Sequence, residues 1–172
     1  MKYFLKILFF PAFILLLNAC SKSNDLYDWR DENIAAYKAI KENPEYKELR
    51  TETGPEGVYY KVLKTGTGTE YPFQTSKVKI FYRGTYYNGT VFDEGSGGSN
   101  IPKEFSTNST VRGFSFALQN MVVGDKWEIW IPYNLGYGIV GLYDNYTYRT
   151  IIKGYTTLVF EVELVEIIQY PD

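Results

Sequence analysis

Apolar and polar residues alternate along several stretches of the chain, and this period of two predicts β-strands. Residues 58–63 (VYYKVL) form the first such stretch. In the second, Val78, Ile80 and Tyr82 alternate with their neighbours, so we expect these three side chains to face the core. The same alternation recurs at 126–132 and 158–167, which predicts two further strands.

Two stretches have the three- and four-residue spacing of helices instead. The first runs from about Trp29 to Leu49 and is divided by Pro44, which disfavours helical geometry in the residue before it. Its apolar side packs either on the following domain or on another protein, and the following domain is the simpler expectation. The second is a single short helix within 113–121.

Glycine-rich and polar segments separate these elements. We expect Asn88-Gly89 to supply the two positive-φ residues of a tight hairpin turn. Residues 51–57, 95–100 and 132–155 are predicted loops, and the last of them is rich in Gly, Tyr and Asn. Together these patterns predict an α+β fold in which a curved antiparallel sheet wraps over one short helix.

The N-terminal 19 residues carry an early positive charge and an apolar run too short to span a bilayer, which is typical of a signal peptide. The sequence LNAC at 17–20 resembles a bacterial lipobox, so Cys20 is predicted to be lipidated. The alternative is an ordinary signal peptide or an uncleaved anchor. We therefore divide the chain into a signal peptide (1–19), a lipid-anchored tether with a helical extension (20–54) and one domain (55–172).

Composition narrows the chemistry. The chain has no histidine and a single cysteine, so it lacks the commonest general base, any internal disulfide and a cysteine-histidine nucleophile. Its formal net charge is −2 and it has no basic stripe, which argues against a nucleic-acid partner. A histidine or thiolate-cluster metal site is likewise not expected.

Seven short motifs occur in a characteristic order: YRG (82–84), GTVFD (89–93), VRGF (111–114), ALQNMVVGDK (117–126), IP (131–132), YG (137–138) and LVFEVEL (158–164). In this order and spacing they resemble the FKBP-type peptidyl-prolyl cis-trans isomerases. The resemblance runs from about Val58 to Ile167. It implies an FKBP-like domain that binds proline-containing polypeptides and needs neither a metal nor a cofactor.

The resemblance also implies the residues of an apolar pocket, with roles for three polar groups. Tyr137 would donate a hydrogen bond to the carbonyl before proline, and Asp93 would either face the reacting imide or orient Tyr82. The expected substrate-binding residues are Phe92, Val111, Phe114, Ile152 and Phe160, with Ile151 at the rim. Without the resemblance, the phenylalanines among them read as core aromatics.

Two departures from the family pattern bear on the site. Phe114 stands where most members have tryptophan, and residues 139–150 lengthen a loop that flanks the pocket. Phe105 belongs either to the pocket wall or to the core. We expect a lipid-anchored isomerase of the bacterial cell envelope, on the outer membrane, that assists the folding of exported proteins. The alternatives are a non-catalytic binding module with the same fold and a structural lipoprotein whose helical extension mediates assembly.

Overall fold

The computed structural model describes residues 25–95 and 100–169. The predicted signal peptide, Cys20 and most of the predicted loop at 95–100 lie outside this range. The described elements are α1 (Asp25–Glu42), β1 (Lys47–Glu48), β2 (Tyr59–Lys64), β3 (Lys77–Tyr86), β4 (Val91–Glu94), β5 (Lys103–Ser106), α2 (Arg112–Leu118), β6 (Lys126–Ile131), β7 (Gly141–Tyr143), β8 (Thr150–Lys153) and β9 (Leu158–Gln169).

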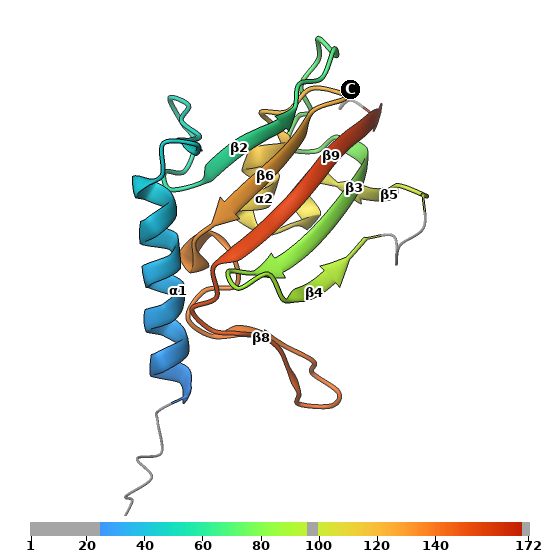
Figure 1. Cartoon of the computed structure of the whole chain (residues 1–172). Coiled ribbons are helices and arrows are strands. Elements are labelled where there is room, and N and C mark those ends of the chain that lie inside the picture. Colours follow the sequence, from blue (N-terminus) through green and yellow to red (C-terminus); the bar gives the residue numbers. More distant parts are fainter. Residues whose placement is uncertain (1–24, 96–99, 170–172) are drawn as a thin grey trace, which may run out of the picture.

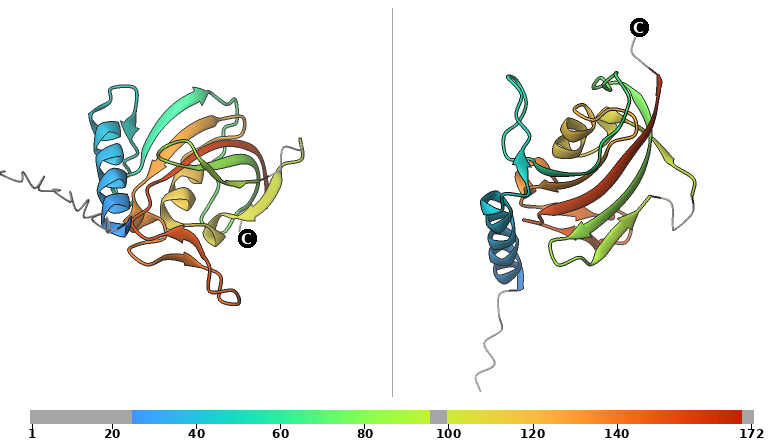
Figure 2. Two further views of the ribbon diagram at one scale, coloured as in Figure 1. Left: turned by 60° about the horizontal axis from the view of Figure 1, so that its bottom comes forward. Right: turned by 45° about the horizontal axis from the view of Figure 1, so that its top comes forward.

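Within the described residues, a seven-stranded antiparallel sheet has the order β1-β2-β6-β9-β3-β4, and β5 also pairs with β3. The sheet curves around α2, which lies in its concavity, while α1 lies outside it (Figures 1 and 2). This arrangement confirms the predicted α+β fold.

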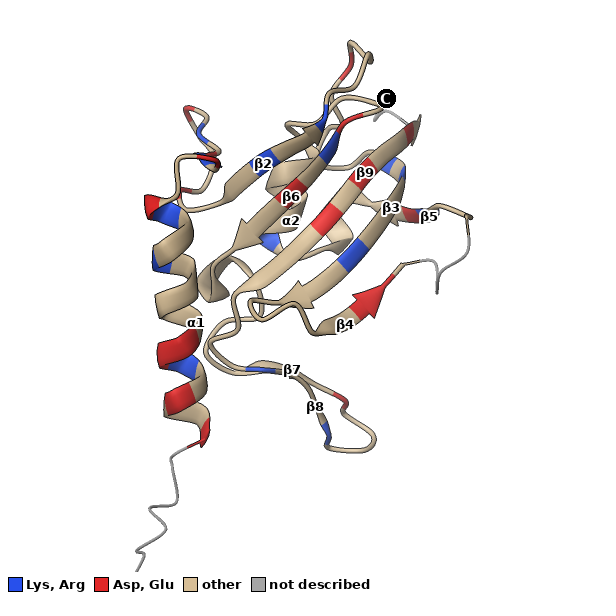
Figure 3. Cartoon of the chain, in the orientation of Figure 1, with Lys and Arg blue, Asp and Glu red and all other residues tan. Residues whose placement is uncertain are grey.

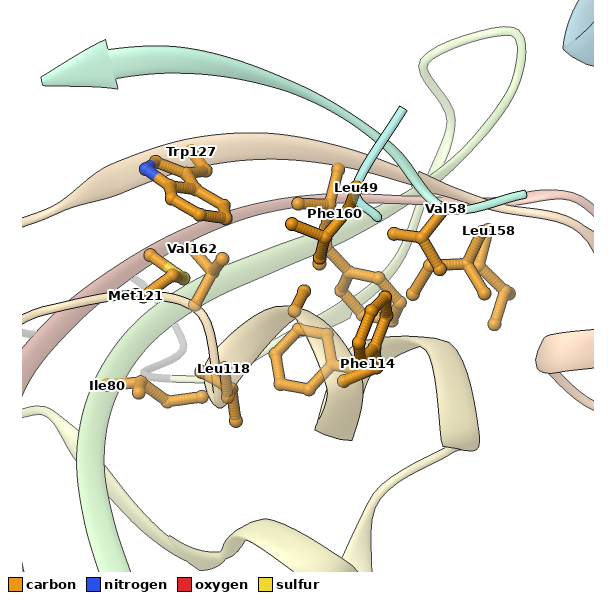
Figure 4. Close-up of a cluster of buried hydrophobic side chains, with 14 of the residues drawn as sticks. Leu49, Val58, Ile80, Phe114, Leu118, Met121, Trp127, Leu158, Phe160 and Val162 are labelled. Carbon is orange, nitrogen blue, oxygen red and sulfur yellow. The ribbon is translucent and has the colours of Figure 1, made fainter. Parts of the chain in front are cut away.

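The core lies between the concave face of the sheet and α2 (Figure 4). Val78 and Ile80 are fully buried there, as their alternation in β3 predicts. Phe114 and Leu118 of α2 and the following Met121 are also buried, which confirms the predicted apolar face of this short helix. Helical spacing and strand alternation therefore converge on one core.

The prediction from the sequence placed both ends of α1 incorrectly. The helix begins at Asp25 rather than near Trp29, and it ends at Glu42, before Pro44. Residues 47–48, which the spacing assigned to the helix, instead form β1 and pair with Tyr59 and Tyr60 of β2. Sheet pairing at this edge thus outweighed a local helical pattern.

The apolar side of α1 packs on the outer face of its own sheet rather than remaining free for another protein. Tyr37 and Ile40 cover a buried cluster formed by Tyr59, Trp130 and Val159. Polar contacts fix the helix in place. Buried Asn33 donates to the carbonyl of Trp29 at 2.7 Å and accepts the Thr157 amide at 2.8 Å.

The turn between β3 and β4 differs from the sequence prediction. Gly89 has a φ of +82°, whereas Asn88 does not have a positive φ. The amide of Gly89 donates to the Tyr86 carbonyl and the amide of Tyr86 donates to Thr90. This pattern is a three-residue hairpin loop ending in a glycine bulge.

The predicted loop at 132–155 contains a second antiparallel hairpin, formed by β7 and β8. Asp144 organises its tip, because the carboxylate accepts the amides of Tyr146 and Thr147. These hydrogen bonds hold the pKa of Asp144 below its ordinary value. The prediction missed the hairpin because its strands are short and its tip is long.

Positively and negatively charged residues lie on neighbouring strands of the main sheet (Figure 3), and their side chains form cross-strand pairs of opposite sign. The Lys79 ammonium lies 2.7 Å from Glu166, and the Lys126 ammonium lies 2.6 Å from Glu161. Such exposed pairs each contribute about 0–1 kcal/mol to stability. Among the described helices, none has both the length and the apolar character needed to cross a membrane.

Candidate active site

A small pocket opens between α2, β3, β4 and the segment that follows β6. Its volume is about 130 Å³. It is lined by Ile80, Tyr82, Asp93, Phe105, Ser109, Thr110, Val111, Phe114, Tyr137 and Phe160. An apolar cavity of about 150 Å³ holds a benzene ring, so this pocket matches the scale of one small ring.

The apolar floor of the pocket is aromatic. The rings of Phe114 and Phe160 pack edge-to-face, with centroids 4.8 Å apart and 63° between their planes, and both residues are buried. Tyr82 and Phe105 form a second edge-to-face pair at 5.5 Å. A region of this kind excludes water while leaving an apolar surface for a ligand.

Gly84 of β3 makes the packing of this floor possible. A Cβ atom at that position would lie 2.7 Å from the Phe92 ring and 2.8 Å from the Phe160 ring. Only glycine therefore fits at this point of the strand without movement of the rings. Phe92 packs edge-to-face on Phe160, with ring centroids 5.5 Å apart, and so supports one ring of the floor.

Two phenols and one carboxylate form the polar part of the pocket. The Tyr82 hydroxyl donates to the Asp93 carboxylate at 2.9 Å. Two effects raise the pKa of Tyr82: burial, which is the larger, and this hydrogen bond to a carboxylate. Burial is also the larger cause of a raised pKa at Tyr137, and the negative charge of Asp93 is the smaller one. Both phenols therefore stay protonated near neutral pH and serve as hydrogen-bond donors.

Tyr137 is the phenol with a free donor. Its side chain is half-buried and lines the pocket, and its hydroxyl has no hydrogen-bond partner among the residues that the structure describes. The Tyr82 hydroxyl, in contrast, is already engaged with Asp93. Tyr137 can thus donate to a ligand carbonyl without first giving up another bond.

The structure brings six of the nine expected site residues together around one cavity: Tyr82, Asp93, Val111, Phe114, Tyr137 and Phe160. The other three do not line it. Phe92 packs on the ring of Phe160, Ile152 is buried in the core with 2% of its surface exposed, and Ile151 is 51% exposed on β8. Contacts of these three residues with a bound ligand stay a prediction.

Other lining residues were not predicted. Ile80 lies two positions before Tyr82 on the same face of β3, so strand alternation could have identified it. Ser109 ends a short 3₁₀ turn (Thr107–Ser109) and Thr110 follows it, and neither residue carries a local signal. The sequence did not decide whether Phe105 belongs to the pocket wall or to the core. It belongs to both, because it lines the pocket and packs against the core cluster. Within the described ranges 25–95 and 100–169, no group of three or more metal-ligating side chains could hold a metal ion.

A curved antiparallel sheet around a short helix, with an aromatic pocket between them, is the architecture of FKBP-type domains. The family model for FKBP-type peptidyl-prolyl cis-trans isomerases matches residues 68–165, and the chain belongs to this family.

Curated relatives agree with this assignment. The chain is 40% identical over 112 residues to the FKBP-type 22 kDa peptidyl-prolyl cis-trans isomerase of Escherichia coli, covering 65% of this chain and 50% of the relative. It is 35% identical over 113 residues to the macrophage infectivity potentiator of Trypanosoma cruzi, covering 66% and 54%. The chain thus spans about half the length of these curated relatives.

Solved structures share the fold. A peptidyl-prolyl cis-trans isomerase from Pseudomonas syringae pv. tomato is 31% identical with a TM-score of 0.68, covering 83% of this chain and 96% of that chain. FkpA from Escherichia coli is 27% identical with a TM-score of 0.68, covering 86% and 62%.

Proposed function

We propose that this protein is a peptidyl-prolyl cis-trans isomerase and that the aromatic pocket is its active site. The observation that carries the proposal is the composition of this one cavity. A ring-sized apolar floor formed by Phe114 and Phe160 lies beside the free hydroxyl of Tyr137 and the hydrogen-bonded pair of Tyr82 and Asp93. Family membership supports the same activity.

The reaction suits these groups because no covalent bond is broken. Rotation about the X-Pro bond crosses a barrier of about 18–20 kcal/mol, since the planar amide is stabilised by resonance. The twisted transition state has a less polarised carbonyl than the planar amide, so an apolar, water-poor pocket favours it. We propose that the proline ring packs on Phe114 and Phe160.

The polar groups would then hold the peptide in a turn. In this proposal Tyr137 donates to the carbonyl before proline, and the Val111 amide donates to the next carbonyl. Asp93 accepts from Tyr82, which keeps the carboxylate oriented at the rim. Differential stabilisation of about 3–4 kcal/mol would give a rate gain of about 10²–10³.

The test is the cis/trans relaxation rate of a short X-Pro peptide with the wild-type protein, Asp93→Ala and Tyr137→Phe. We expect clear acceleration by the wild type and at least a tenfold loss in each variant. Tyr148→Phe is the matched control, because Tyr148 is an exposed tyrosine at the tip of the β7–β8 hairpin. We expect its rate to equal that of the wild type.

Folding of each variant is checked by circular dichroism. Acceleration that is equal in all four proteins would remove the pocket from the mechanism. A folded wild type that accelerates no X-Pro peptide, whatever residue precedes proline, would instead favour a non-catalytic binding module with the same fold.

We further propose that the mature protein is lipid-anchored through Cys20 on the bacterial cell envelope and assists the folding of exported proteins. The LNAC sequence and the short apolar run before it support the anchor. A matching relative from Legionella longbeachae is named outer membrane protein MIP, which supports the location. Cys20→Ser should move the protein from the membrane fraction to the soluble fraction, and an unchanged distribution would contradict the anchor.

A further inference from the structure

Two open hollows lie along α2 beside the proposed active site. The first lies between α2 and residues 51–55, and Thr110 lines both this hollow and the aromatic pocket. The second lies beyond the C-terminal end of α2, and Gln74, Gln119 and Asn120 line both hollows. The shared residues place the two hollows next to each other along α2 and next to the pocket, and we call the two hollows together the α2 groove.

The far end of the α2 groove is aromatic. The ring of Tyr60 stacks on Trp127 with centroids 4.4 Å apart and 26° between the planes. Both residues line the groove together with Tyr71, which is 56% exposed. An aromatic surface of this kind binds apolar side chains and ring systems.

Trp127 also carries an unpaired donor. Its side chain is 6% exposed, and within the described ranges its indole N–H has no hydrogen-bond acceptor. Figure 4 shows the nitrogen on the side of the ring that points away from Leu49 and Phe160. A buried donor without a partner is unfavourable, and the signal of this N–H reports on the aromatic end of the groove, because the Trp127 ring lines it.

The middle of the α2 groove is polar and suits a polypeptide backbone. The side-chain nitrogen of Gln119 donates to the Ser115 carbonyl at 3.0 Å, and that of Asn120 donates to the Phe116 carbonyl at 2.8 Å. With their nitrogens engaged inside the helix, the two amide oxygens are available as acceptors for backbone N–H groups.

We propose that the α2 groove binds the polypeptide segment next to the isomerised proline, with an apolar or aromatic side chain on Tyr71 and Trp127. This inference rests on the proposed function, because it places proline in the aromatic pocket. Residues 111 to 120 span about 14 Å at the 1.5 Å rise of a helix. An extended chain covers that length in about four residues, so the preferred side chain lies about four to six residues from proline.

The kinetic test compares the full chain on matched twelve-residue peptides that contain one proline. One pair has Phe or Ser five residues before proline, and the other has Phe or Ser five residues after it. We expect kcat/KM for one Phe peptide to exceed that of its Ser partner about tenfold, which corresponds to about 1.4 kcal/mol.

Tyr71→Ala should bring this Phe-to-Ser ratio close to one, whereas the control Tyr148→Ala should keep it near ten. The responding pair also shows which way the polypeptide runs along α2. Equal rates on Phe and Ser peptides in the wild type, or an unchanged ratio in Tyr71→Ala, would overturn the proposal.

A binding test separates this proposal from the proposed isomerase activity. In nitrogen-15 spectra, the indole signal of Trp127 is assigned by its loss in Trp127→Phe. Titration with the Phe peptides should shift this signal, and the Ser peptides should shift it much less at equal concentration. A shift without isomerisation would support the groove and reject the enzyme. Isomerisation without a shift would do the reverse.

Discussion

Asn33→Ala should detach α1 from the sheet and destabilise the whole fold. The amide of Asn33 is fully buried and forms two strong contacts, to the Trp29 carbonyl and from the Thr157 amide. In the variant, the Thr157 N–H stays buried without an acceptor, which costs about 1–3 kcal/mol, and the lost bond to Trp29 costs about 0.5–1.5 kcal/mol more.

We therefore expect the free energy of unfolding to fall by about 1.5–4.5 kcal/mol. For a chain of this size the corresponding loss in Tm is roughly 5–15 °C. Urea unfolding followed by circular dichroism measures the free energy, and hydrogen exchange at Thr157 reports the local contact. Asn145→Ala is the control, because Asn145 is exposed at the β7–β8 tip.

A free energy of unfolding within about 0.5 kcal/mol of the wild type, with unchanged protection of the Thr157 amide, would refute the reasoning. It would mean that the apolar contacts of Tyr37 and Ile40 hold α1 without the help of Asn33. Faster exchange at Thr157 with unchanged global stability would mean that the helix undocks locally.

Three further predictions follow from other contacts. Burial, followed by a hydrogen bond to a carboxylate, raises the pKa of Tyr46 to about 12 from its ordinary value of 10, so the folded state keeps this proton after the unfolded chain has lost it. Stability should therefore fall as pH rises from about 10 to 12, and Tyr46→Phe should lessen the fall in urea midpoints. Gly84→Ala should lower stability by about 1–3 kcal/mol and reduce isomerase activity, because the new methyl group displaces the rings of Phe92 and Phe160; unchanged unfolding and peptide kinetics would contradict this. Asp125→Ala should lower the free energy of unfolding in urea by about 2–4 kcal/mol, because the backbone amides of Gly66 and Val122 lose their buried acceptor. A loss under about 1 kcal/mol would show that other contacts hold the turn at 122–125.

The strands of the main sheet and α2 were predictable because their side-chain periods are unambiguous. Val78 and Ile80 alternate strictly and are buried, and Phe114 and Leu118 share one helical face. The end of α1 was harder, since residues 45–49 keep a helical spacing although Lys47 and Glu48 pair with β2. Pairing with a strand outside the few residues considered has no signal in the spacing of those residues.

The candidate site was predictable where the backbone register is regular and uncertain where it shifts. Tyr82 and Phe160 follow the inward alternation of their strands and line the pocket. In β4 the pairing skips a residue, because Gly84 pairs with Asp93 whereas Thr85 pairs with Val91. Phe92 lies at this irregularity and packs on Phe160, and the direction of a side chain at such a shift cannot be read from sequence spacing alone.

The contact between α1 and the outer face of the sheet joins the two ends of the described chain. The hydrogen bond between Asn33 and Thr157 links residues 124 positions apart. Loops of this length close late, because their entropy must be offset by contacts already formed. Since a chain is synthesised from its N-terminus, α1 exists before its binding surface and stays undocked until residues 157–159 have been made. We therefore expect α1 to dock late in folding, and a fluorophore on this helix would time that step.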